Sequence, residues 1–277
     1  MNSSAELSTS DNLGSICALW RYPVKSMMGE EVNTGYLTPR GLFGDRAYAL
    51  IDTSTGKIAS AKNPSKWPTM FQFRAALTEP PTLNQTLPSA RITLPGGETV
   101  LSDSTDVDTI LSNELGRPVV IKSSVPETPE LEEYWPDIEG LVLKETVTVE
   151  AMPEGTFFDL AVLHILTTST INSLRSIYPE GRFEVRRFRP NLVVEVPDDT
   201  QFAENDWIGK EIKVGDATLK ITGPCPRCVM TTLPQYDLPK DPGILRTAAK
   251  HNNAHVGVYA SVVQSGAVSI GDTLTVT

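Results

Sequence analysis

Gly223-Pro224-Cys225-Pro226-Arg227-Cys228 holds two of the three cysteines of this 277-residue chain. It follows a predicted β-hairpin, with strands over Glu211 to Val214 and Thr218 to Thr222 and a tight turn at Gly215-Asp216. Cysteines in a Pro-flanked turn beside an arginine are more typical of soft-metal ligation or redox chemistry than of a packed core. We therefore expect a mainly β fold that presents its chemistry at the end of this hairpin.

On the residues alone, three interpretations of Cys225 and Cys228 stay open. They could form half of a zinc site with His251 and His255, whose spacing is about that of zinc-finger ligand pairs. They could form a thioredoxin-like dithiol, which needs the start of a helix after the motif, but Val229 to Thr232 has a β-like composition. They could also be one metal-ligating cysteine and a neighbour.

The composition argues against several classes of protein. There are 24 basic and 34 acidic residues, a net charge of -10, which disfavours general binding of nucleic acid. Three cysteines suit a reducing compartment better than a disulfide scaffold. The chain has no run of about 18 apolar residues, and its first residues lack the apolar core of a signal peptide. We expect a soluble cytoplasmic protein with neither nucleic acid nor a membrane as its partner.

Short β-branched and aromatic segments predict a mainly β fold with a few helices, in the α+β class. Helices are predicted over Ser104 to Leu115, from Thr168 or Ser169 to about Tyr178, and over Asp241 to His251. Further strands are predicted over Ser15 to Tyr22, Val32 to Leu37, Ala47 to Asp52, Phe71 to Leu77, Asn191 to Val196, Val256 to Val263 and Val268 to Val276.

The composition also predicts how the chain is divided. Residues 1–12 are polar and are expected to form a disordered tail. Residues 124–143 combine prolines with acidic side chains and are predicted to form an exposed loop or linker. This segment is the expected boundary between an N-terminal domain over residues 13–123 and a C-terminal domain over residues 144–277.

A cluster of arginines reverses the sign of the charge locally. Four arginines fall within the eight residues from Arg182 to Arg189. The planar fork of an arginine suits phosphate and carboxylate groups. Arg189, which precedes Pro190-Asn191, is predicted to bind an anion, whereas Arg182 and Arg186 are predicted to pair with acids at the surface.

A second candidate anion site lies near the start of the chain. Tyr22-Pro23-Val24-Lys25-Ser26 ends the first predicted strand with a lysine and a hydroxyl that can hold an oxyanion. Gly41-Leu42-Phe43-Gly44-Asp45-Arg46 adds a glycine-bearing turn followed by an arginine. Neither pattern is specific by itself.

Taken together and in this order, the motifs resemble one family. They are Tyr-Pro-Val-Lys-Ser, Gly-Leu-x-Gly-Asp-Arg, Phe-Arg-Pro-Asn at 188–191, Cys-x-Arg-Cys and the closing Gly-Asp-x-Leu-x-Val at 271–276. The chain resembles, from about Ile16 to Val276, a MOSC protein with its N-terminal β-barrel domain. MOSC domains are named after the C-terminal domain of molybdenum cofactor sulfurases, and the closer likeness is to mitochondrial amidoxime-reducing components and their bacterial relatives. The resemblance implies a MOSC β-barrel plus an N-terminal β-barrel-like domain.

The resemblance also implies a site. A molybdenum cofactor (Mo-molybdopterin) is expected between the two domains, with Cys228 as catalytic residue and metal ligand and Cys225 as its neighbour. Further cofactor contacts are implied for Lys25, Ser26, Arg46, Arg189, Asn191, Pro226, Arg227, Tyr259 and, more loosely, Thr167 or Thr168. The charges agree, because a phosphate in an acidic protein needs cations and Arg227 should favour the thiolate beside it. The family is also associated with pyridoxal phosphate binding.

The implied activity is a molybdenum-dependent reduction of N-hydroxylated compounds such as amidoximes, hydroxylamines and N-hydroxylated bases. Three cysteines are too few for the plant-type ferredoxin domain that some bacterial relatives carry, so an external electron donor of the ferredoxin or flavoprotein reductase type is expected. The acidic segment Glu127 to Glu139 is a candidate docking site for it. Two alternatives are a carrier or maturation protein that passes on the cofactor or sulfur without turnover, and a zinc-bound structural module.

Overall fold

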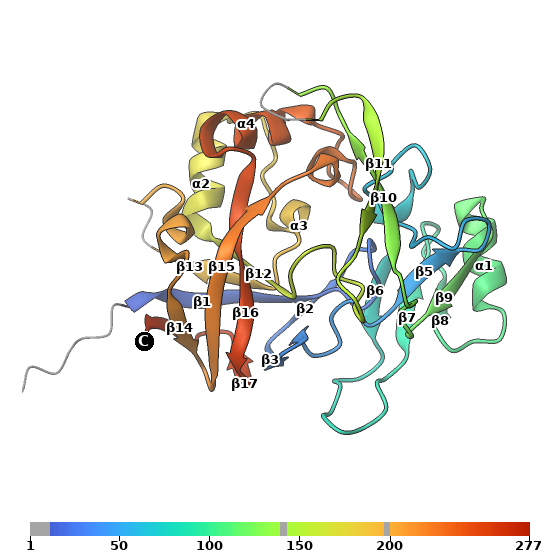
Figure 1. Ribbon diagram of the computed structural model, residues 1–277, viewed down its shortest axis with the longest axis horizontal. Helices are drawn as coiled ribbons and strands as arrows, with labels where there is room; N and C mark the ends of the chain where they lie inside the picture. The colour runs from blue at the N-terminus through green and yellow to red at the C-terminus, as the bar shows by residue number, and fades with distance from the viewer. Residues whose placement is uncertain (1–11, 139–142, 197–199) are drawn as a thin grey trace, which may run out of the picture.

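The computed structural model describes residues 12–138, 143–196 and 200–277. Seven of its strands form a closed barrel, in the order β13, β12, β16, β15, β14, β18 and β1, with β1 hydrogen-bonded to both β18 and β13 (Figure 1). Their bounds are β1 (Asn12–Arg21), β12 (Leu163–Thr167), β13 (Leu192–Glu195), β14 (Glu211–Val214), β15 (Ala217–Pro226), β16 (His255–Gln264) and β18 (Thr273–Val276). The predicted mainly β class and the barrel are confirmed, and full closure leaves no unpaired edge in the barrel.

Alternating apolar residues fill the barrel, as the period of a strand requires. Its core includes Ile16 and Leu19 of β1, Ile165 of β12, Ile212 of β14 and Val258 of β16, all at most 1% exposed. The strand at the start of the described chain therefore shares one core with strands from its C-terminal half.

The hairpin of β14 and β15 turns at Gly215, whose φ of 53° lies in the left-handed region that favours glycine. β15 continues through Pro226, so Cys225 lies on the strand itself. After Cys228 the chain forms the 3-10 helix η3 (Val229–Thr232), so the β-like interpretation of these residues was wrong. Val229 and Met230 are buried in the N-terminal core, and this long-range packing overrides their β propensity.

Three helices accompany the barrel. α2 (Thr168–Ile177) and α4 (Pro242–Asn252) lie over one end of it, at the top of Figure 1, and the short α3 (Val185–Phe188) lies nearby. The helix predicted over Asp241 to His251 is confirmed as α4, and Asp241 caps it by accepting from the backbone N–H of Gly243. The 3-10 helix η2 (Ala203–Trp207) follows β13 along the chain.

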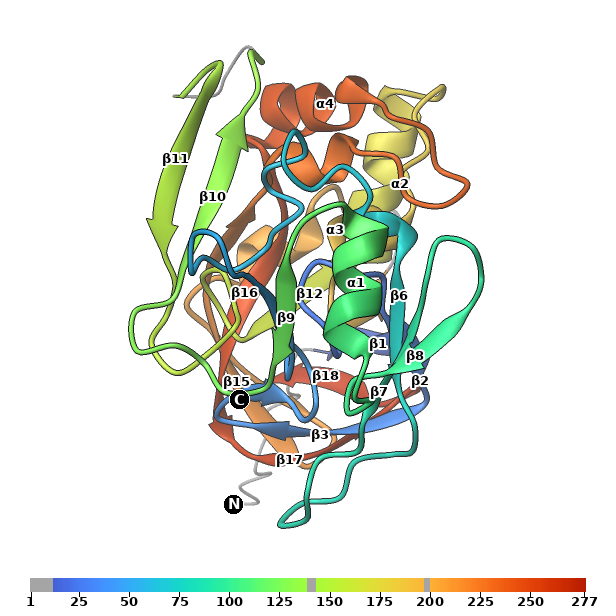
Figure 2. The same ribbon diagram turned by 90° about the vertical axis from the view of Figure 1, so that its right-hand side faces the viewer.

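Ten further elements of the N-terminal part lie beside the barrel, and most of them share a second core. They are β2 (Glu30–Val32), β3 (Thr34–Thr38), β4 (Gly41–Leu42), β5 (Ala49–Asp52), η1 (Met70–Gln72), β6 (Arg74–Leu77), β7 (Ala90–Thr93), β8 (Thr99–Leu101), α1 (Val107–Leu115) and β9 (Val119–Lys122). β5 pairs with β9, β6 to β8 form a small sheet, and β3 pairs with β4 and with β17 (Gly266–Ser269). Figure 2 shows α1 alongside β9. α1 ends at Gly116, in the left-handed conformation expected of a glycine stop.

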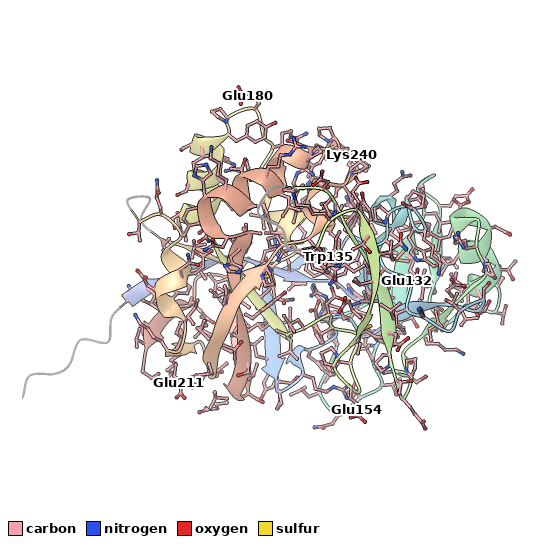
Figure 3. The ribbon with its side chains drawn as sticks, turned by 45° about the horizontal axis from the view of Figure 1, so that its top comes forward. Glu132, Trp135, Glu154, Glu180, Glu211 and Lys240 are labelled. Carbon is pink, nitrogen blue, oxygen red and sulfur yellow. The ribbon has the colours of Figure 1, made fainter. Side chains whose placement is uncertain are left out.

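The predicted exposed loop over residues 124–143 is corrected at its centre. Glu130–Trp135 forms strand β10, which pairs with β11 (Thr146–Ala151), and Figure 3 shows Glu132 and Trp135 along it. Lys62 pairs with Glu133, and Lys66 pairs with Glu132, so lysines distant in sequence neutralise the acidic run. Residues 139–142 of this segment lie outside the described residues.

The structure bears differently on the predicted terminal tail and on the predicted domain boundaries. Residues 1–11 of the predicted tail lie outside the described residues, and Asn12 already belongs to β1. The predicted domain boundaries stay a prediction, although β1 joins the barrel of the C-terminal half. Across the described ranges, we find no helix with the length and apolar character needed to cross a membrane.

Candidate functional site

A cavity of about 350 Å³ opens between the barrel and the N-terminal elements, and we call it the charged cavity. Nine of the eleven predicted site residues line it. They are Lys25, Ser26, Arg46, Arg189, Asn191, Pro226, Arg227, Cys228 and Tyr259. Its volume lies in the range of small-molecule sites, about 300–1,000 Å³. Segments far apart in the sequence thus meet in one place.

The cationic wall of this cavity consists of Lys25, Arg46 and Arg189, and the two arginines lie over the buried ring of Tyr22. The guanidinium carbon of Arg189 lies 4.2 Å from the Tyr22 ring centroid, and that of Arg46 lies 4.6 Å from it. Arg189 donates to the carbonyl of Met27 at 2.6 Å, whereas Arg46 forms an ion pair with Asp45. Burial and, to a smaller extent, the neighbouring Arg46 lower the pKa of Arg189 to about 10. Two positive charges on one aromatic ring favour the binding of an anion.

Three non-glycine residues of the cavity have left-handed backbones. The φ angles are 64° at Ser26, 46° at Arg46 and 53° at Arg189. Such conformations cost free energy and persist where surrounding contacts fix them. The Ser26 hydroxyl accepts from the backbone N–H of Ala61 at 3.1 Å, one such contact. Arg189 adopts this conformation directly after α3, at its C-cap.

Asn191 braces the cationic wall. Its amide donates to Asp45 at 2.9 Å and to the carbonyl of Trp20 at 3.2 Å, and its carbonyl accepts from the backbone N–H of His164. Asp45 in turn accepts from the backbone N–H of Tyr22 at 2.7 Å. Although Asn191 lines the cavity, these contacts within the protein already occupy its amide group.

A network of four charged side chains extends the wall. Lys25 donates to Asp159 and to the carbonyl of Phe157, and Lys62 pairs with Glu133 at 2.9 Å and with Asp159 at 3.6 Å. Burial lowers the pKa of Lys25 to about 8, against the opposing charge of Asp159. Burial would raise the pKa of Asp159, but Lys25 and Lys62 hold it well below its usual range.

The thiol wall of the cavity consists of Arg227 and Cys228, and the fully buried Cys225 contacts Arg227 without lining the cavity. Arg227 donates to Cys225 Sγ at 2.6 Å and to the carbonyl of Phe188 at 2.8 Å. Despite burial, Arg227 and His164 lower the pKa of Cys225 to about 6. Burial raises the pKa of Cys228 to about 11, although the charge of Lys62 opposes it. The charge of Arg227 also lowers the pKa of Cys228, as expected, but burial outweighs this effect, and the guanidinium hydrogen-bonds to Cys225 instead.

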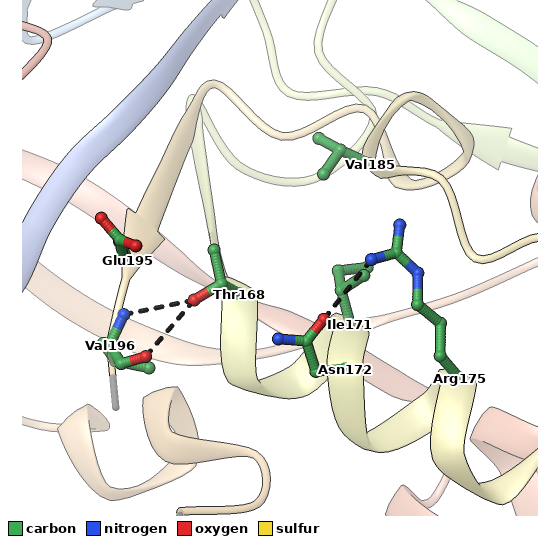
Figure 4. A pocket seen from close by; sticks show the side chains of 7 residues that line it. All are labelled: Thr168, Ile171, Asn172, Arg175, Val185, Glu195 and Val196. Carbon is green, nitrogen blue, oxygen red and sulfur yellow. Dashed lines mark hydrogen bonds between the residues drawn. The ribbon is translucent and has the colours of Figure 1, made fainter. Parts of the chain in front are cut away.

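Thr167 and Thr168 do not line the charged cavity. Thr167 is fully buried and donates to Glu204, and its oxygen accepts from the backbone N–H of Thr170 at the start of α2. Thr168 lines a separate groove, where its hydroxyl contacts the backbone of Val196 (Figure 4). Both hydroxyls hold local structure in this part of the molecule.

The arginine cluster divides by burial. Arg182 and Arg186 pair with Asp237 at the surface, as predicted. Arg187 is fully buried and donates to backbone carbonyls, including those of Leu233 and Pro239, so it holds the segment after η3. Among the described residues, no group of three or more His, Cys, Asp or Glu side chains is arranged to hold a metal, so the structure does not support the zinc interpretation.

Several lining residues were not predicted from the sequence. The main ones are Lys62, Glu133, Trp135, Phe157, Phe158, Asp159 and His164. Asp159 follows two phenylalanines, an arrangement with no chemical signal of its own, and Lys62 and Glu133 are recognisable only as a pair formed by folding. These three charged residues can be identified as site residues only once the fold shows that they are buried beside one another.

The charged cavity fits an anionic cofactor with a soft metal. Its lining contains five cationic side chains, from Lys25, Arg46, Lys62, Arg189 and Arg227, against three carboxylates, from Glu133, Glu150 and Asp159. The Nε of Arg227 is buried and has no hydrogen-bond partner among the described residues, which leaves a donor for a ligand. Cys228 is only partly buried and supplies a thiol, a ligand type suited to soft metals.

Comparisons with known proteins agree with this arrangement. Residues 13–113 match the MOSC N-terminal beta barrel domain, and residues 154–275 match the MOSC domain. Molybdenum cofactor sulfurase of Oryza sativa subsp. japonica is 26% identical over 244 residues, which are 77% of this chain and 28% of that protein. Mitochondrial amidoxime reducing component 2 of Macaca fascicularis is 24% identical over 233 residues, which are 80% of this chain and 67% of that protein.

Among solved structures, the YUAD protein from Bacillus subtilis is 12% identical with a TM-score of 0.49, covering 97% of this chain and 98% of that one. The two family models together match most of the chain. The chain therefore belongs to the family of proteins that join a MOSC N-terminal beta barrel domain to a MOSC domain.

Proposed function

We propose that this protein binds a molybdenum cofactor in the charged cavity and reduces N-hydroxylated compounds with electrons from an external donor. The observation that carries the proposal is the meeting of the cationic wall and the partly exposed Cys228 thiol in one cavity. The names of the relatives, an amidoxime reducing component and a molybdenum cofactor sulfurase, support a link to this cofactor.

The residues present would hold the cofactor in two ways. Lys25, Arg46 and Arg189 would bind its anionic end, with charge-assisted hydrogen bonds of about 1.5–3 kcal/mol each. Cys228 would bind the metal as a thiolate. Its raised pKa is that of the metal-free thiol, and a coordinating metal deprotonates a thiol outright.

When bound, the cofactor would supply two electrons, which with two protons cleave the N–O bond of the substrate and release the oxygen as water. The chain itself supplies the enclosure. Phe157 and Phe158 are almost fully buried and form an apolar part of the cavity lining, and Trp135 adds a further aromatic surface. Such walls limit the access of water to the reacting groups.

Metal and pterin content test the proposal first. Protein purified from cells that make the cofactor should contain near-stoichiometric molybdenum and pterin, and should reduce an aryl amidoxime with a chemically reduced viologen dye. Protein without molybdenum and pterin would contradict the proposal, and zinc without pterin would favour the structural zinc module.

A carrier or maturation protein is the second candidate, and the likeness to molybdenum cofactor sulfurase is the observation that favours it. Full occupancy without turnover, together with transfer of the cofactor or of sulfur to an acceptor protein, would identify that function. A ferredoxin or flavoprotein reductase as electron donor remains part of the proposal, and the association with pyridoxal phosphate stays a prediction.

A further inference from the structure

Arg227 is a cation of the cavity lining without a carboxylate partner in the described part of the chain. Its guanidinium donates to one carbonyl, that of Phe188 at 2.8 Å, and to one sulfur, Cys225 Sγ at 2.6 Å. Every other cation of the lining except Arg189 forms an ion pair with an acid. Arg189 instead lies over the face of Tyr22, which offers it a negative quadrupole.

Arg227 is partly buried and its Nε is fully enclosed, so a nearby negative charge stabilises the guanidinium, because an unpaired cation loses free energy where it loses water. Tyr259 and Cys228 are the other acidic groups whose charge acts on Arg227. Neither is hydrogen-bonded to the guanidinium in the structure, whereas Cys225 Sγ lies within hydrogen-bond distance. The sulfur of Cys225 is therefore the group placed to carry the counter-charge.

We propose that Cys225 is a buried thiolate that acts as the counter-charge of Arg227 and fixes its guanidinium at the wall of the charged cavity. Cys225 is then a positioning residue, and it is distinct from the metal ligand. It is fully buried and is not part of the cavity lining, whereas Cys228 is partly exposed and lines the cavity. The anion-binding purpose of this arrangement rests on the proposed function, but the thiolate itself does not.

Three groups around Cys225 favour its ionised form. Arg227 directly follows the end of β15, His164 lies on β12 and Tyr259 lies on β16, and His164 and Tyr259 are cross-strand partners. His164 and Tyr259 act on Cys225 through hydrogen bonds, and together with Arg227 they lower its pKa to about 6 against the effect of burial. These surroundings therefore favour the ionised form of the thiol at neutral pH.

The arrangement has a consequence for the ligand. With its terminal nitrogens held by Cys225 and Phe188, Arg227 keeps a buried Nε without a partner in the described structure. A fixed guanidinium with a free donor suits an oxygen of an anionic ligand, because the side chain is already ordered before binding. Loss of the thiolate should therefore weaken anion binding even though Cys225 does not touch the ligand.

Thiolate titration of the full chain, prepared without the molybdenum cofactor, tests the proposal. The ultraviolet thiolate absorbance should appear as the pH rises through about 6, well below the ordinary thiol value of 9.0. Cys225→Ser should abolish this signal, whereas Cys228→Ser and Cys17→Ser should retain it. A signal that survives in Cys225→Ser, or one that is missing from the wild type, would overturn the proposal.

A second variant tests the same proposal in case Cys225→Ser does not fold. Arg227→Gln keeps the thiol but removes the charge, and it should move the thiolate titration upward by at least about one pH unit, tenfold in proton affinity. An unchanged midpoint in folded Arg227→Gln would show that Arg227 does not stabilise the thiolate.

Binding of inorganic phosphate to the same cofactor-free proteins tests the positioning role. Cys225→Ser should bind phosphate about tenfold more weakly than wild type, since one charge-assisted hydrogen bond is misplaced. Cys17→Ser, a change on β1, is the matched control and should bind like wild type. Equal phosphate affinity in Cys225→Ser and wild type, or no binding to wild type, would overturn the positioning role. Neither measurement depends on reductase activity, so failure here is separate from failure of the proposed function.

Discussion

The two walls of the charged cavity stabilise a buried or partly buried positive charge in different ways. In the cationic wall, Arg189 is held by an aromatic ring and a carbonyl, so its positive charge is left for a ligand. In the thiol wall, Arg227 contacts a thiol of lowered pKa, so its charge is balanced within the protein. Two arginines of one cavity can therefore differ: the charge of Arg189 is left to attract a ligand, whereas Arg227 is balanced by the protein and offers a ligand an ordered hydrogen-bond donor.

Removal of the Cys228 thiol should have the largest effect. In Cys228→Ala, bound molybdenum should fall to background while the fold survives. The change removes the thiol that lines the cavity and is accessible to a metal. Cys225→Ala should lose less metal. Metal analysis of protein from cofactor-producing cells measures both, and equal molybdenum in wild type and Cys228→Ala would contradict the assignment of the ligand.

The cationic wall is tested by exchanging one of its arginines against a surface arginine. Arg189→Ala should reduce retained pterin tenfold or more, since even one charge-assisted hydrogen bond contributes about 1.5–3 kcal/mol. Arg182→Ala, which removes an exposed ion pair with Asp237, is the matched control and should retain pterin like wild type. Fluorescence of the released pterin reports the difference, and similar retention in the two variants would remove Arg189 from the ligand-binding wall.

The balanced charge of the thiol wall should appear in the pH dependence of stability. Cys225 has its pKa depressed from 9.0 to about 6 in the folded protein, so its stabilisation is complete above pH 9 and is lost as the pH falls to 6. The free energy of unfolding of wild type relative to Cys225→Ser should therefore rise by about 1.4 kcal/mol per pH unit across this window. Denaturant titrations at several pH values measure it, and a flat difference would be evidence against the ionised thiol.

The smallest expected effect separates the ring of Tyr22 from its hydroxyl. Tyr22→Phe removes a hydrogen bond of 3.2 Å to the carbonyl of Pro190 and should cost about 1 kcal/mol of stability. The ring remains under Arg46 and Arg189, so pterin retention should stay unchanged, whereas Tyr22→Leu should reduce it. Equal pterin retention in Tyr22→Leu and Tyr22→Phe would show that the aromatic face does not orient the arginines.

Local sequence signals predicted those parts of the molecule that short-range chemistry determines. The helices α1 and α4 and the turn at Gly215 were each predicted from a short stretch of sequence. The motifs likewise predicted nine residues that the fold brings to one cavity. Whether these residues bind a cofactor stays a prediction.

What could not be predicted depends on contacts between distant segments. Asp159 joins Lys25 and Lys62 only after folding, and the residues after Cys228 form a 3-10 helix because they pack into the N-terminal core. The sequence order of Cys225, Arg227 and Cys228 does not reveal which thiol receives the guanidinium. Thr167 was predicted to contact the cofactor only because it carries a hydroxyl, and in the folded protein that hydroxyl donates to Glu204.

The closure of the barrel by β1 has a consequence for how the protein is synthesised. Ser15 pairs with Glu195 on one side and with Thr273 on the other, so a strand that leaves the ribosome early waits for partners that emerge much later. Such long-range pairing slows folding and leaves apolar strands exposed in the nascent chain. Chaperone demand should therefore fall if a circular permutation placed β1 directly after β18. A fragment cut at the predicted linker would expose the edges of β13 and β18, where aggregation begins.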